Sequence, residues 1–123
     1  MDVVVTVPKS SWEGWKREGD LPGDAWGSGD AGRDGEYYFF TSSEPDINPG
    51  DRVYVVAHGR LRGYAPLDRV EYFDYRSFGL VRKGGAVAVT IDTPIGGFRG
   101  YRYRWWDRAD EHPFPDWMTE GVK

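Results

Sequence analysis

The segment from Phe98 to Arg108 interleaves arginines with aromatic residues, a combination suited to phosphates and bases. Side chains alternate between the two faces of a strand, so the aromatic residues here would share one face and the arginines the other. The aromatic set is Tyr101, Tyr103 and Trp105, and the arginine set is Arg102 and Arg104. We expect the aromatic face to pack in the core and the arginine face to contact nucleic acid, with a plain solvated face as the alternative.

A predicted hairpin supplies two further arginines for the same face. A Pro-Gly-Asp turn ending at Asp51 precedes the apolar run Val53–Ala57, which is expected to be buried on both faces. A turn at Gly59 leads into a second run, in which Arg60 and Arg62 alternate with an apolar residue and are expected to face solvent or a ligand. Together with the arginines of the first segment they could form a stripe that binds phosphates.

The charge distribution permits such a face in an acidic protein. The net charge is −4, but residues 51–108 are basic and lie between acidic flanks. Nearly all the cations of that middle part are arginine, which suits bidentate phosphate contacts and stacking on bases. The preference for arginine, with many Gly, Ala and Asp residues, is typical of GC-rich coding sequences such as those of many bacteria and their phages.

The order of predicted elements gives a β-rich chain with minor helix. Strands are expected at 3–7, 36–41, 51–57, 60–73, 86–91 and 98–103, with a turn at 74–79 and a tail at 111–118 packed over the sheet. A short helix is expected after the first strand, capped by Ser10 or Ser11 and ended by Gly19, before a long loop over 20–35. Gly63 and Pro66 are expected to bend the fourth strand. The length suits a single domain over residues 1–123.

The hairpin from Gly50 to Leu67, with its Pro-Gly-Asp turn and glycine-bent second strand, resembles the central hairpin of the PUA-like superfamily, which includes the PUA, ASCH, EVE and YTH domains. The order of elements from Val3 to about Tyr103 resembles that superfamily more loosely. The resemblance implies a mixed α+β fold, a β-barrel of about six strands with a short helix after strand one. It also implies a module that binds RNA or DNA, and in some of these families such a module reads a modified or extruded base.

In the families that read a base, the pocket lies between the first helix, the following loop and the barrel strands. By this resemblance Trp12 and Trp26 are the candidates to grip the base, and aromatic stacking would contribute roughly 1–3 kcal/mol. The other candidates by the same resemblance are Lys9, Ser10, His58 and Tyr64.

Two other functions remain open. Some ASCH domains are similar to small amidohydrolases or ribonucleases, for which this chain offers Lys9, Ser10 or Ser11, and Glu71. The lysine-x-x-threonine spacing of that family is absent, so an enzyme is disfavoured. A protein-interaction domain of bacterial or phage origin is the second alternative, and it would expose the aromatic tail from His112 to Met118.

The sequence predicts neither a metal nor a cofactor. His58 and His112 lack partners at metal-ligand spacing, and the aspartates of the 20–35 loop do not follow a calcium-binding pattern. The chain has no cysteine, and its first residues form neither a signal peptide nor a membrane span. We therefore expect a cytoplasmic protein that does not associate with membranes.

Overall fold

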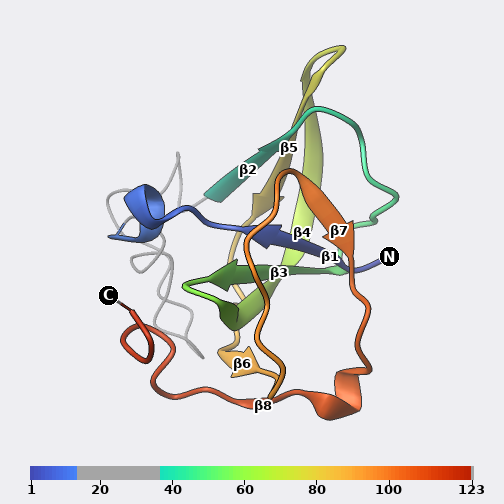
Figure 1. The fold of residues 1–123 in the computed structure, drawn as a ribbon. Helices are drawn as coiled ribbons and strands as arrows, with labels where there is room; N and C mark the ends of the chain where they lie inside the picture. The colour runs from blue at the N-terminus through green and yellow to red at the C-terminus, as the bar shows by residue number, and fades with distance from the viewer. Residues whose placement is uncertain (14–36, 123) are drawn as a thin grey trace.

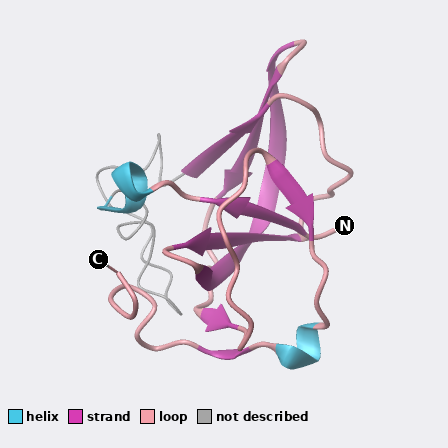
Figure 2. Ribbon diagram, viewed as in Figure 1, coloured by secondary structure: helices cyan, strands magenta, loops and turns pink. Residues whose placement is uncertain are grey.

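The computed structural model describes residues 1–13 and 37–122, and these form a β-rich fold (Figures 1 and 2). Two 3-10 turns are described, η1 (Lys9–Ser11) and η3 (Arg108–Asp110). The strands are β1 (Val3–Thr6), β2 (Tyr37–Thr41), β3 (Arg52–Ala57), β4 (Arg60–Asp74), β5 (Ser77–Arg82), β6 (Val89–Thr90), β7 (Tyr101–Tyr103) and β8 (His112–Pro113).

Six of these strands form one curled sheet, a half-barrel, in the order β2-β5-β4-β3-β1-β7. β1 pairs in parallel with β3, and the other neighbours in the sheet are antiparallel. β4 is long enough to pair with β3 along its first part and with β5 along its second. The sheet therefore ends in two edge strands, β2 and β7, and β6 and β8 form a separate small ribbon.

Both faces of the central strands are buried. In β3, Val53 and Val55 join one apolar cluster, while Tyr54 and Val56 join a second on the opposite face. β1 divides its valines between the clusters in the same way. Because side chains alternate along a strand, a continuous apolar run requires cover on both sides, and the predicted burial of β3 on both faces is confirmed.

The predicted bend of β4 lies at a β-bulge. Gly63 pairs with Val55 whereas Leu61 pairs with Val56, so Arg62 is the extra residue between them. A bulge bends its strand and redirects the local side chains, which suits the curl of the sheet at this point.

Three predicted elements need correction. The turn expected at 74–79 is shorter, because β5 begins at Ser77 and includes Gly79, where a Cβ would lie 2.8 Å from the Phe73 ring. Gly79 therefore makes room for an aromatic side chain within a strand rather than forming a turn. The strand expected at 86–91 is only β6, with one isolated bridge at Val87. Of the predicted helix, the described residues contain η1 and the start of the next turn; the rest lies outside the described residues.

Asp2 ties the amino terminus to the carboxyl-terminal half. Its carboxylate accepts hydrogen bonds from the backbone N–H of Arg52 at 2.8 Å, from Arg104 Nε at 3.0 Å and from Arg108 Nη2 at 2.7 Å. Burial alone would raise the pKa of this carboxyl, but the hydrogen bonds from Arg52, Arg108 and Arg104 outweigh burial and lower it below 3.8.

Stability should therefore fall in acid through Asp2. A carboxyl whose pKa is lower in the folded state stabilises the protein above its unfolded pKa of about 3.9, and this stabilisation is lost as pH falls through the folded pKa. Asp2→Asn should reduce the free energy of unfolding at pH 7 by about 1–2 kcal/mol and flatten its pH dependence below pH 4. Urea denaturation from pH 2.5 to 7 measures both effects, and equal acid slopes for the two proteins would contradict this role of Asp2.

Candidate nucleic-acid interface

Residues at the end of β2 and residues in and just before β7, the two edge strands of the curled sheet, line one groove. Its volume is about 340 Å³. Hydroxyl groups, two arginines and two tyrosines line it: Thr41, Ser42, Ser43, Arg99, Gly100, Tyr101, Arg102 and Tyr103. The groove thus combines hydrogen-bond donors with aromatic rings, and none of the described residues on its walls carries a carboxylate.

Arg99 and Arg102 give this groove its charge. Both side chains are exposed, and no acidic side chain of the described residues forms an ion pair with either. The Arg102 guanidinium lies 4.5 Å from the centre of the Phe98 ring, a cation–π contact that orders the side chain without neutralising it. Two arginines without acidic partners, one of them ordered by Phe98, can bind phosphate oxygens.

Trp105 adds an exposed aromatic surface beside the arginines. The Trp105 residue is 50% exposed. Its ring packs edge-on against Phe98, with ring centroids 6.4 Å apart, and against Trp106, with ring centroids 5.0 Å apart. The prediction that Trp105 faces the core is wrong, because β7 ends at Tyr103 and the alternation of a strand does not extend to residue 105. Its accessible ring can stack on a base.

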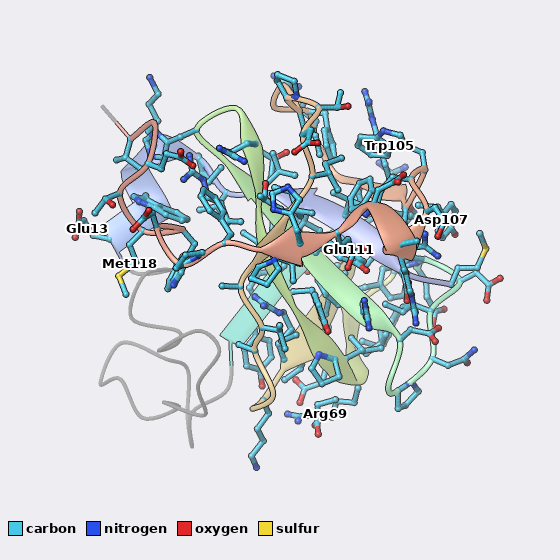
Figure 3. All side chains as sticks on the ribbon, turned by 90° about the horizontal axis from the view of Figure 1, so that it is seen from below. Glu13, Arg69, Trp105, Asp107, Glu111 and Met118 are labelled. Carbon is cyan, nitrogen blue, oxygen red and sulfur yellow. The ribbon has the colours of Figure 1, made fainter. Side chains whose placement is uncertain are left out.

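The buried carboxylate of Glu111, labelled in Figure 3, holds Trp106, the residue next to Trp105, in place. Glu111, with 5% of its side chain exposed, accepts hydrogen bonds from Trp106 Nε1 at 2.8 Å, Tyr54 Oη at 2.6 Å and Arg52 Nη1 at 3.1 Å. Burial raises the pKa of the Tyr54 phenol, and the hydrogen bond to Glu111 raises it further, so this phenol remains a donor. Glu111 thereby positions Trp106, on which Trp105 packs.

The predicted arginine stripe does not form. Arg62 is 1% exposed, and Arg60 is partly buried in an ion pair with Glu120, so the expectation that both face solvent is wrong for Arg62 and only partly right for Arg60. The carboxyl-terminal segment covers this face of β4, because both guanidiniums lie over the Phe114 ring. Arg104 is held by Asp2 and by the carbonyl oxygen of Trp106. Of the four predicted arginines, Arg102 alone is exposed.

The predicted base pocket is also different. Trp12 is only 3% exposed and packs edge-on between His58 and Trp117, with ring centroids 5.5 and 5.9 Å away, so its faces are not open to a base. Tyr64 lies beneath the Arg52 guanidinium, 4.1 Å from its ring centre. Trp26 lies outside the described residues.

Two of the residues predicted for the base pocket do line one hollow, which is smaller than the groove beside β7. Lys9 and His58 line it together with Gly59 and Gly121. Ser10 is exposed in η1 and is not among the lining residues.

The residues of the hydrolase alternative do not converge. Glu71, on β4, is bound by Arg69 at 2.5 Å and accepts a hydrogen bond from Tyr38. No hydrogen bond or ion pair in the described part of the chain joins Lys9 or Ser10 to Glu71. The aromatic tail is packed rather than exposed, since Phe114 and Trp117 are buried in the core.

Sequence reasoning missed the exposed aromatic residues of the arm formed by β2, the distal part of β4 and β5. Phe40 and Phe73 pack edge-on with a centroid distance of 5.3 Å, and both are at least half exposed, as are Tyr72 and Tyr75. The run Tyr37–Phe40 contained a usable signal, because four consecutive aromatic residues on a strand must place two on each face.

No protein-family model, curated protein or solved structure matches this chain. The resemblance to the PUA-like superfamily therefore stays a prediction. In the described residues no group of His, Cys, Asp and Glu is arranged to hold a metal ion. None of the described helical segments has the length and apolar character needed to cross a membrane.

Proposed function

We propose that this chain binds single-stranded RNA or DNA at the surface formed by Arg99, Arg102, Trp105 and the groove beside them. The observation that carries the proposal is the pair of exposed arginines without acidic partners next to a half-exposed tryptophan. The same proposal includes a PUA-like fold and the reading of a modified or extruded base. In it, Trp105 takes the stacking role that the resemblance predicted for Trp12.

The chemistry of the surface favours an unpaired strand over a duplex. Arginine guanidinium groups bind phosphate oxygens whatever the nucleotide sequence. The serine hydroxyls at 42 and 43 can donate hydrogen bonds to the same sugar-phosphate backbone. A base can stack on the open Trp105 ring only if it is not already stacked between neighbouring bases. Such stacking on an aromatic ring contributes roughly 1–3 kcal/mol. A base that is turned away from its strand can also enter the groove beside β7.

Intrinsic tryptophan fluorescence tests the proposal. Titration with single-stranded 12-nucleotide RNA and DNA should quench emission to saturation, and quenching should weaken as salt rises from 50 to 200 mM. Trp105→Phe should lose most of the quenching, whereas Trp12→Phe should keep it. Unchanged emission with every oligonucleotide, even at 50 mM salt, would refute the proposal.

Protein interaction is a second candidate, favoured by the aromatic arm. Phe40, Tyr72, Phe73 and Tyr75 are all exposed there, and clusters of exposed aromatic side chains are typical of contact surfaces. Arg69, which donates to Tyr38 of this arm, lies on the side opposite Trp105 in Figure 3. The two surfaces can therefore be tested separately.

The double variant Phe73→Ser/Tyr75→Ser separates the two functions. It removes apolar rings from the arm and should leave the affinity for single strands within about twofold of the wild type, because the arginine surface is untouched. Fluorescence anisotropy of a labelled oligonucleotide measures this. A tenfold loss of affinity in this variant would move the nucleic-acid site to the arm.

A further inference from the structure

Arg62 is a buried cation without a buried anion. Its guanidinium donates to the carbonyl oxygens of Ala57 at 2.8 Å, His58 at 3.3 Å, Trp117 at 3.1 Å and Glu120 at 2.6 Å. No carboxylate of the described residues forms an ion pair with it, since the Glu120 carboxylate binds Arg60 instead. The carbonyl oxygens satisfy the N–H groups of the guanidinium but carry no full negative charge, so the cation is hydrogen-bonded without being neutralised by direct contact with a carboxylate.

A hollow of about 270 Å³ lies at the turn between β3 and β4, and one of its lining residues, Gly121, lies beside this guanidinium. The turn residues His58 and Gly59 have φ of 50° and 80°, which is the geometry of a tight two-residue hairpin. Gly121 lines the opposite wall, and a Cβ on it would lie 3.6 Å from Arg62 Nη2. A Cβ at Gly59 would meet no atom within 4 Å, so this wall of the hollow is open, whereas Gly121 separates the hollow from the Arg62 guanidinium.

The walls of the hollow carry basic side chains and no acidic one. Lys9 reaches it from η1 and forms no ion pair with any described residue. His58 has its pKa lowered by burial and by the charges of Arg62 and Lys9, so the ring is neutral at pH 7. Two buried ring nitrogens here, Trp12 Nε1 and His58 Nε2, have no hydrogen-bond partner in the described part of the chain.

We propose that this hollow binds a phosphate group, with the Lys9 ammonium in direct contact and the Arg62 charge stabilising the anion from beneath. The exposed lysine lines the hollow and the buried guanidinium lies behind its Gly121 wall, so both positive charges act on a phosphate dianion bound there, one by contact and one through the wall. The site is separate from the Arg99 and Arg102 surface and does not depend on its function. The phosphate is either free or the terminal 5′-phosphate of an oligonucleotide.

Titration with inorganic phosphate at constant ionic strength tests the site, with isothermal calorimetry for affinity and amide NMR shifts for location. Wild-type protein should bind one equivalent saturably and shift the Lys9, Gly59 and Gly121 signals. Lys9→Ala should weaken binding at least tenfold, whereas Lys83→Ala, which removes an exposed lysine outside the hollow, should not change it. Absence of saturable binding, or equal affinity of Lys9→Ala and wild type, would overturn the proposal.

A second experiment identifies the source of the phosphate. In the Arg99→Ala/Arg102→Ala background, 5′-phosphorylated and 5′-hydroxyl oligonucleotides are compared as competitors of inorganic phosphate. Competition by the phosphorylated strand alone assigns the hollow to a strand end. Competition by neither strand, with phosphate binding retained, assigns it to a free phosphate.

Discussion

Arg99→Ala/Arg102→Ala is expected to weaken binding of a single-stranded 12-nucleotide strand by roughly 30-fold at 100 mM salt. Each lost charge-assisted contact to a phosphate costs about 1 kcal/mol or slightly more, and two such losses give this factor. The dependence of log K on log salt should become shallower by about 1.4, because each phosphate contact on a single strand contributes about 0.7. Fluorescence anisotropy at four salt concentrations measures both quantities.

Arg76→Ala is the matched control for this double variant. Arg76 is an exposed arginine that also lies over an aromatic ring, that of Tyr75, but it belongs to the turn between β4 and β5. Its removal should change affinity by less than twofold. Equal losses from the control and the double variant would mean that binding follows total charge rather than the β7 surface.

Glu111→Ala is expected to lower the free energy of unfolding by about 3 kcal/mol. The substitution leaves the Tyr54 hydroxyl and the Trp106 indole N–H buried without their acceptor, and it leaves Arg52 without its counter-ion. Removing one partner of a buried, hydrogen-bonded charge pair costs about 3–5 kcal/mol, and the partial exposure of Arg52 places this case at the lower end. Urea denaturation at pH 7 measures the change.

Glu120→Ala is the control for this substitution. Glu120 also pairs with an arginine at short distance, 2.6 Å to Arg60, but its carboxylate is half exposed. Exposed pairs contribute about 0–1 kcal/mol, so this variant should remain close to the wild type. Similar losses in the two variants would contradict the distinction between a buried anchor and a surface pair.

Those parts of the fold that depend on local pattern could be predicted from the sequence. Valine-rich runs define β1 and β3, and their burial on both faces follows because each run is apolar without interruption. The bend of β4 was predicted from Gly63, which lies at the bulge. β5 was missed because Gly79 is typical of a turn, whereas here it accommodates aromatic rings from neighbouring strands.

Predictions that depend on distant segments were less successful. Arg62 alternates in the sequence as an exposed residue does, yet carbonyl oxygens 55 and 58 residues further along the chain cover it. Asp2 likewise holds Arg104 from 102 residues away. Arg102 was predicted correctly as exposed, because its neighbours on β7 alone determine its face. A single sequence shows strand periodicity but not which segment will cover a given face.

The most direct test of the nucleic-acid surface is an NMR titration of ¹⁵N-labelled protein with a single-stranded oligonucleotide that carries a 5′-hydroxyl end. The six tryptophans provide indole N–H signals, and the signal that is missing in Trp105→Phe is that of Trp105. We predict that the Trp105 indole and the amides of Tyr101–Tyr103 shift on binding, while the buried Trp12 and Trp117 indoles do not. Shifts confined to the aromatic arm of β2, the distal part of β4 and β5, or no shifts at all, would contradict the account.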